Sequence, residues 1–224
     1  MGRIRIINQY EPEMEEIYYD EQNFQKRYIL LSDNYTKAEK DYLTIIMPAA
    51  AGAILNFIGW STRYPRVEQG GFLVGRYYYD EKKKRKICVV EFAFPAKEAS
   101  GDVVSLHITH EDAAEMYRKL DALNKNYPES KKLQLVGWFH THPNALDVFM
   151  SGVDQETQSQ LFGDEKSIAL VFNPNRKIWK SYRSGTHEDN RAELLIDQDL
   201  FEKYGKKRLL NQEFGFGGGK DDEN

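Results

Sequence analysis

The stretch Val136-Gly-Trp-Phe-His-Thr-His-Pro143, followed by Ser151-Gly-Val-Asp154, decides which fold and chemistry we expect of this chain. Its apolar, aromatic first half predicts a buried strand, which ends at Pro143 because proline cannot donate to a sheet ladder. His140 and His142 are two residues apart, so an extended backbone places both imidazoles on one face. The two rings can therefore converge on a single point.

Ser151 stands where a helix is expected to begin, and a serine at that position can cap the first turn. Asp154 follows three residues later and shares a helix face with Ser151. Two imidazoles and one carboxylate make three ligands, the number with which a catalytic zinc keeps its fourth position open. Iron(II) accepts the same donor set, so these residues by themselves leave both metals open.

An upstream segment, Glu68-Gln-Gly-Gly-Phe-Leu-Val-Gly75, completes a recognisable pattern. A glutamate before a glycine-punctuated strand, then His-x-His and Ser-x-x-Asp, resembles the JAMM (MPN) zinc metallo-isopeptidases, in particular their prokaryotic type. The resemblance covers about residues 43–185. One departure is the loop 143–150, which is one residue longer than the family's spacing. Loops tolerate such insertions, so the ligand set stays intact while the rim of the cleft changes.

The resemblance implies an α/β fold of the MPN (cytidine-deaminase-like) type, with a central mixed β-sheet flanked by helices. It implies one Zn²⁺ per chain, held by His140, His142 and Asp154. Glu68 would act as general base and Ser151 as a hydrogen-bond donor to the oxyanion that forms during the reaction. The implied activity is a deubiquitinase-like metallopeptidase that cleaves after the C-terminal glycine of a ubiquitin-like protein.

The expected partners follow from the same resemblance. The substrate would be a ubiquitin-like protein or its conjugate, in a bacterial ubiquitin-like or antiphage pathway that also contains E1-like and E2-like proteins. Two other functions remain open: a catalytically silent MPN scaffold and a non-peptide zinc amidohydrolase. Scaffold members of the family usually lose ligands, whereas this chain keeps all three together with Glu68 and Ser151.

Composition narrows the setting in which the protein works. The 224 residues carry a net charge of -4, which gives no support to nucleic-acid binding. The single cysteine, Cys88, lies in a β-branched run that predicts a buried strand, and it fits a reducing cytoplasm. The long apolar run at 43–60 is interrupted by proline and glycine, so we expect a buried helix there and no membrane partner.

We expect the chain to divide into an N-terminal extension (1–42), a catalytic domain (43–205) and a flexible tail (206–224). The periodicity of the apolar residues predicts the elements inside the domain. We expect strands at 44–47, 69–79, 85–95, 103–108, 167–172 and 177–183, and helices beginning at Pro48 and spanning 111–126. We also expect a C-terminal amphipathic helix at 190–204.

His107 and His110 form a second histidine pair. They flank a predicted junction between a strand and a helix, and no third ligand stands at a recognisable spacing from them. We therefore expect a role in packing or in starting the helix.

Overall fold

The computed structural model describes residues 28–33, 42–61, 67–80, 84–97, 99–101, 105–162, 166–173, 175–176, 178–183 and 189–197. The main strands are β1 (Tyr28–Asp33), β2 (Tyr42–Ile46), β3 (Gly70–Asp80), β4 (Arg85–Pro95), β7 (Gln134–Thr141), β8 (Ile168–Asn173), β9 (Ile178–Arg183) and β10 (Asp189–Asp197). Helices are α2 (Pro48–Ser61), α3 (His110–Asn124) and α4 (Gly152–Leu161), with a 3-10 turn at Glu129–Lys131. Two short strands, β5 (Ser100–Gly101) and β6 (Leu106–His107), pair with each other.

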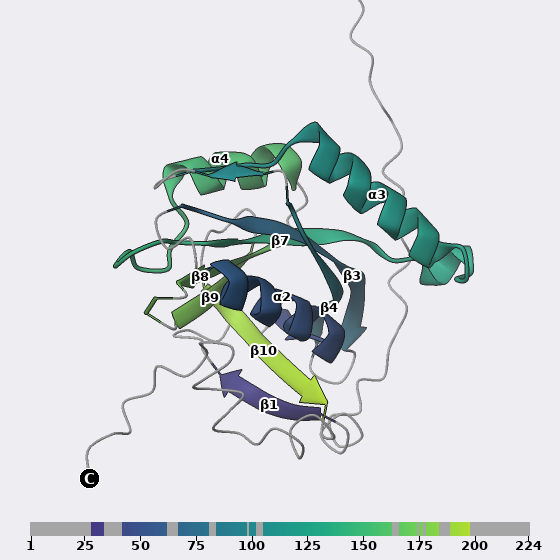
Figure 1. Cartoon of the computed structure of the whole chain (residues 1–224). Helices are drawn as coiled ribbons and strands as arrows, with labels where there is room; N and C mark the ends of the chain where they lie inside the picture. The colour runs from purple at the N-terminus through teal and green to yellow at the C-terminus, as the bar shows by residue number, and fades with distance from the viewer. Residues whose placement is uncertain are drawn as a thin grey trace, which may run out of the picture.

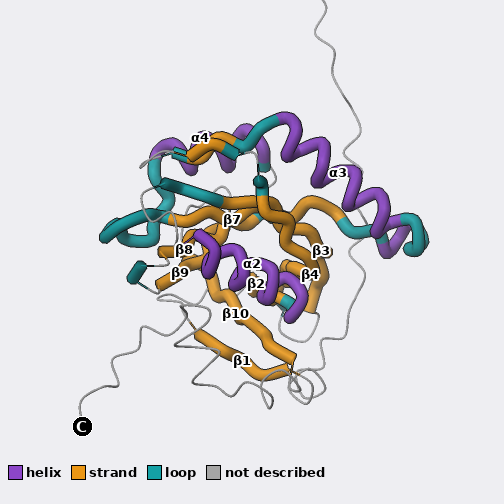
Figure 2. The backbone as a smooth tube through the Cα atoms, in the orientation of Figure 1, coloured by secondary structure: helices purple, strands orange, loops and turns teal. Residues whose placement is uncertain are grey.

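The eight main strands form one mixed sheet in the order β1-β10-β2-β4-β3-β7-β8-β9. Strand β10 connects its distant parts, because it runs parallel to β2 and antiparallel to both β1 and β9. Its first residues pair with β9 and its later ones with β1, so the far edge of the sheet returns to β10 (Figure 2). The expected α/β architecture with a mixed sheet flanked by helices is confirmed.

Helices cover the two faces of the sheet unequally (Figure 1). On one face α2 packs through Ala50, Ile54 and Phe57 against apolar residues of β2, β4, β7 and β8. On the other face α3, together with Phe162 directly after α4, packs on a separate core that includes Trp138 of β7. Successive side chains of β7 therefore point to opposite faces of the sheet, and those on the same face as Trp138 point toward α3 and α4.

Gly137 fixes the position of β7 within the sheet. It has a φ of 155°, and a Cβ there would lie 2.0 Å from the carbonyl oxygen of Ile168 on β8. The register between β3 and β7 also shifts at this point, between Leu73 and Val74. A side chain at position 137 would push β8 away, so glycine is required for the close approach of the strands.

Most expected elements are present near their expected bounds. Strands β2, β3, β4, β8 and β9 and helices α2 and α3 lie where the periodicity placed them, and Cys88 is fully buried in β4. The strand expected at 103–108 is reduced to β6, and 102–104 lie outside the described residues. In the described part of the chain, no helix is both long and apolar enough to cross a membrane.

The predicted C-terminal helix at 190–204 is wrong for the part that the structure describes. Residues 189–197 form strand β10. Alanine, glutamate and leucine favour a helix, but apolar residues here also alternate at Ala192, Leu194 and Ile196, as in a strand. Pairing with three other strands satisfies the backbone, and Ala192 is buried in the core beside α2. Residues 198–204 lie outside the described part.

Part of the predicted N-terminal extension belongs to the sheet. Residues 28–33 form β1, which pairs antiparallel with β10, and Tyr42 opens β2. Residues 1–27, 34–41 and the predicted tail lie outside the described residues.

Candidate metal centre

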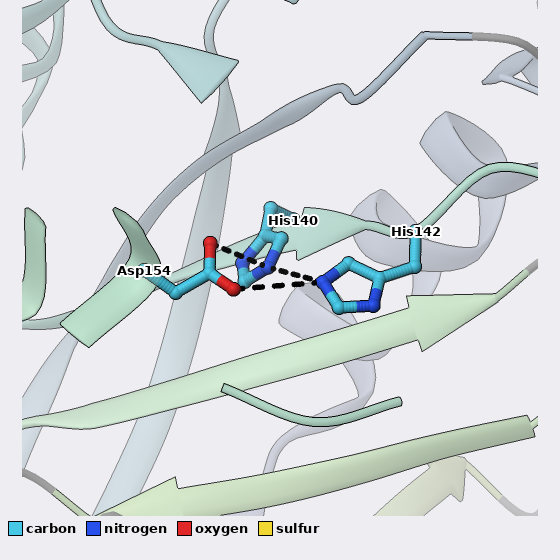
Figure 3. Close-up of side chains that lie close together, drawn as sticks. All are labelled: His140, His142 and Asp154. Carbon is cyan, nitrogen blue, oxygen red and sulfur yellow. Dashed lines mark hydrogen bonds and ion pairs between the residues drawn. The ribbon is translucent and has the colours of Figure 1, made fainter. Parts of the chain in front are cut away.

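Three predicted ligands meet where β7 ends and α4 begins. His140 lies near the end of β7, His142 follows the strand, and Asp154 lies in the first turn of α4. Both histidines are in step with Trp138, so they face the side of the sheet on which α4 lies. Figure 3 shows the two imidazoles and the carboxylate pointing toward one another, and all three are buried.

The separations between the donor atoms fit a bound metal ion. His140 Nε2 lies 3.2 Å from His142 Nε2 and 3.2 Å from Asp154 Oδ1, and His142 Nε2 lies 3.6 Å from Asp154 Oδ2. Tetrahedral zinc, with bonds of about 2.0–2.1 Å, places neighbouring ligand atoms about 3.3 Å apart. The two nitrogens and the Asp154 carboxylate, whose two oxygens each lie near one of the rings, can hold zinc while leaving one position open.

Asp154 also belongs to the cap of α4. Ser151 Oγ accepts a hydrogen bond from the Asp154 amide at 3.2 Å, and the Ser151 amide donates to Asp154 Oδ2 at 2.8 Å. These reciprocal bonds form a capping box. The cap occupies Oδ2 and leaves Oδ1 toward His140, so the same bonds that start the helix orient the carboxylate.

The tautomer of His142 follows from its surroundings. Its Nδ1 lies 2.7 Å from the main-chain carbonyl oxygen of Asp147. A carbonyl can only accept, so Nδ1 is the donor and the Nε2 of a neutral ring keeps its lone pair for a metal.

His140 is held in a different way. Its ring stacks on Trp138 with centroids 4.4 Å apart, and the indole N–H of Trp138 donates to the side chain of Gln158 on α4. Within the described part of the chain, the buried Nδ1 of His140 has no hydrogen-bond partner. Stacking therefore orients the His140 ring, whereas the hydrogen bond of His142 sets both the orientation of its ring and its tautomer.

Glu68 lies beside His142, just before β3. Strands β3 and β7 are paired at Gly70 and His140, and the next pair, Gln69 and Thr141, is also bonded. The Thr141 amide donates to the Gln69 carbonyl at 2.7 Å. In return the Gln69 amide donates to Thr141 Oγ1 at 3.0 Å. This antiparallel register places Glu68, which is buried, opposite His142.

Gly101 of β5 packs against the main chain of Glu68. A Cβ at position 101 would lie 1.9 Å from the Glu68 carbonyl oxygen. Only glycine permits this approach, so the short β5–β6 sheet supports the position of Glu68.

The electrostatics of the cluster favour a charged Asp154. Burial opposes its charge, but the attraction and hydrogen bonds of His140, with those of His142 and Ser151, hold the pKa of the carboxyl well below its usual range. Burial lowers the pKa of His140, and the attraction of Asp154 offsets this only in part. Burial also acts against a charged His142, but hydrogen bonds to Asp154 and Asp147 and the attraction of Glu68 raise its pKa overall.

The other histidine pair does not join the cluster. His107 and His110 are exposed, and the described residues within reach of a common metal position are His140, His142 and Asp154. Burial raises the pKa of the Cys88 thiol, so this side chain is suited to packing and not to nucleophilic chemistry.

Sequence reasoning missed the residues that support the ligands. A signal for Gln158 was present, because it follows Asp154 by four residues and so shares its helix face. Phe149 was also missed: its half-exposed ring lies edge-on to His142, with centroids 5.1 Å apart. No local pattern indicates that contact, because it depends on the path of the loop.

Comparison with known families gives one match. Residues 50–165 match the model of the family described as JAB1/Mov34/MPN/PAD-1 ubiquitin protease. This span covers more than half of the chain and includes Glu68, His140, His142, Ser151 and Asp154. No curated protein matches the chain in sequence.

Proposed function

Because this chain belongs to the JAB1/Mov34/MPN/PAD-1 family, whose MPN domains include metallo-isopeptidases, we propose that it is a zinc-dependent metallopeptidase. It cleaves the bond after the C-terminal glycine of a ubiquitin-like protein, and thereby releases that protein from a conjugate or processes its precursor. The main support is the buried cluster of His140, His142 and Asp154, with donor atoms at zinc-like separations.

The residues around the cluster divide the chemistry between them. A zinc ion held by the three ligands would polarise the scissile carbonyl and lower the pKa of a water molecule at the site. Glu68, buried opposite His142, takes a proton from the attacking water and passes it to the leaving amine. The products are a carboxylate and an amine, and Glu68 returns to its starting state.

Ser151 supplies a hydrogen-bond donor to the developing oxyanion. Its Oγ accepts from the Asp154 amide, and its hydroxyl hydrogen, which can also bond the Asp154 carboxylate, can be donated to the oxyanion. The helix cap holds this oxygen next to the Asp154 carboxylate, which is one of the three predicted metal ligands. In this role Ser151 stabilises charge and is not a nucleophile.

The substrate class follows from the family and from the shape that a glycine tail can adopt. An extended Gly-Gly segment can lie along a strand edge without side chains that would clash near the bond. We propose a bacterial ubiquitin-like or antiphage pathway, in which E1-like and E2-like proteins attach the tail that this enzyme removes.

A cleavage assay read by intact mass tests the proposal. Wild type, Glu68→Gln and chelator-treated protein are incubated with ubiquitin-like fusions and isopeptide conjugates, and the zinc content of each sample is measured. We expect cuts after the terminal glycine by wild type alone, with zinc retained in Glu68→Gln. Equal cleavage of a substrate that lacks a ubiquitin-like tail would overturn the proposed specificity.

Two other outcomes point to other functions. Stoichiometric zinc in wild type without cleavage of any conjugate would favour a scaffold, a function that other MPN domains have. A small-molecule amide product from a metabolite screen, again without cleavage of conjugates, would favour a non-peptide amidohydrolase.

A further inference from the structure

The loop that joins His142 to Ser151, residues 143–150, is anchored to the end of β8. The side-chain amide of Asn173, the last residue of β8, donates to the carbonyl oxygens of Asn144 at 3.2 Å and Leu146 at 2.6 Å. Asn173 is only 1% exposed. A buried side chain that binds two main-chain carbonyls fixes the path of the loop between them.

The other half of the Asn173 amide is also occupied. Its Oδ1 accepts from the main-chain amides of Asn175 and Arg176, both at 2.9 Å. These bonds close the turn between β8 and β9, so Asn173 joins that turn to the loop. An amide has two donors and two acceptor positions, and all four are used here.

The loop in turn presents a carbonyl to a predicted ligand. Asp147 follows Leu146, and its carbonyl oxygen accepts from His142 Nδ1 at 2.7 Å. The strands also tie His142 to β8, because its amide donates to the Phe172 carbonyl at 2.6 Å. Strand β8 therefore fixes His142 in two ways. Phe172 holds its backbone directly, and Asn173 holds the loop whose Asp147 carbonyl binds its ring.

We propose that Asn173 is a positioning residue for the metal centre, acting through the loop carbonyls to aim the Asp147 carbonyl at His142 Nδ1. This inference rests on the proposed function, in which the cluster binds zinc. Without the aimed carbonyl, the proton of a neutral imidazole can sit on either nitrogen. In the Nε2–H tautomer, the nitrogen that faces His140 and Asp154 has no lone pair with which to bind a metal. Asn173 selects the competent tautomer and holds the ring in line.

The choice of asparagine can be tested with a substitution of nearly identical shape. Asn173→Asp keeps the acceptor toward the turn but presents an oxygen to the two loop carbonyls, which then lose their donors. Asn173→Ser is the milder second variant, because a serine hydroxyl can still accept in the turn but is too short to reach the loop. Arg176→Ala is the matched control, since it removes only the half-exposed ion pair of the same loop, 3.2 Å from Arg176 Nη1 to Asp147 Oδ1.

The experiment measures metal affinity in the folded protein. Zn²⁺ and Co²⁺ dissociation constants are determined by competition with a chromophoric chelator well below the melting temperature, which is recorded for each metal-free variant. Mutation of groups that orient a ligand typically weakens metal binding about 10- to 100-fold. Since Asn173 acts through the loop, we expect roughly 10-fold weaker binding in both Asn173 variants, with an altered Co²⁺ absorption spectrum, and less than about 2-fold in Arg176→Ala.

A second readout does not depend on metal. Nitrogen-15 NMR of the metal-free protein reports the tautomer of His142, and we expect the Nδ1–H form in wild type and a mixture in Asn173→Asp. Wild-type affinity in both Asn173 variants, or an equal loss in Arg176→Ala, would overturn the inference. If wild type binds no zinc the proposed function fails, and an unchanged tautomer in the Asn173 variants would then overturn the positioning role as well.

Discussion

Replacing Ser151 by alanine removes one oxygen atom that has two separable tasks. The Oγ atom accepts from the Asp154 amide in the helix cap, and in the proposed reaction its hydrogen is donated to the oxyanion. The bond to Asp154 Oδ2 is donated by the main-chain amide of residue 151, so the substitution does not remove it. The ligand carboxylate therefore keeps its place, and the loss falls on the cap and on catalysis.

The two losses differ enough in size to be told apart. Removing an N-cap side chain costs about 1 kcal/mol of stability, which lowers the melting temperature of a domain of this size by about 2–4 °C. Removing an oxyanion donor lowers kcat about 100- to 1,000-fold, or roughly 2.7–4 kcal/mol in the barrier. For a protein of ordinary stability, about 5–15 kcal/mol, losing 1 kcal/mol leaves almost all molecules folded. Unfolding thus cannot account for the expected loss of activity.

The chain offers a matched control in α3. Thr109 caps that helix with the same box: its Oγ1 accepts from the Asp112 amide at 3.1 Å, and neither residue belongs to the predicted ligand set. Thr109→Ala should lower the melting temperature by a similar amount and leave kcat unchanged. Steady-state cleavage, circular dichroism and zinc affinity are measured on both variants. If zinc affinity falls in Ser151→Ala as steeply as kcat does, the oxygen acts by holding Asp154 and the assignment to the oxyanion is wrong.

Three further outcomes follow from the geometry. The metal-free protein should lose stability as the pH falls below about 4, because the folded-state pKa of Asp154 lies below its unfolded value of about 3.9. Acid titration followed by circular dichroism should show a smaller loss of stability in Asp154→Asn than in wild type. Gln158→Leu leaves the buried indole N–H of Trp138 without its acceptor, so urea denaturation should show a loss of about 1–3 kcal/mol, and an unchanged midpoint would contradict this contact. Gly101→Ala forces a methyl group against the Glu68 carbonyl, so kcat should fall by about 100-fold while zinc affinity stays at the wild-type value. If kcat and zinc affinity fall together, the substitution displaces the metal ligands as well as Glu68.

The sequence predicted those parts of the fold in which the local pattern and the tertiary structure agree. Paired strands β3 and β4 and helix α3 have one periodicity each, and their bounds were close to those observed. Residues 189–197 carry two periodicities at once, because good helix formers occupy positions that also alternate. Tertiary pairing decides such a case: two of the three partners of β10, the strands β1 and β2, lie about 150 residues earlier in the chain, and no local window contains them.

The same division applies to the site. His140 and His142 are fixed relative to each other by strand geometry, and Ser151 and Asp154 by the first turn of a helix, so short spacings were sufficient to find them. The supporting contacts cross between elements. Asn173 reaches a loop that lies 27 to 29 residues earlier in the chain, and this contact depends on the parallel pairing of β7 with β8. Spacing alone carries no sign of it.

Helix capping is sufficient to explain the spacing of Ser151 and Asp154, without reference to metal binding. Thr109 and Asp112 form the same box at the same spacing in α3, with no metal cluster around them in the described part of the chain. In both boxes one carboxylate oxygen accepts from the capping residue's amide. At Asp154 the other oxygen faces His140, which β7 delivers to the start of α4. The pattern at 151–154 is therefore explained by the helix start alone, as it is at 109–112, and the metal centre depends on the histidine pair that ends a strand beside it.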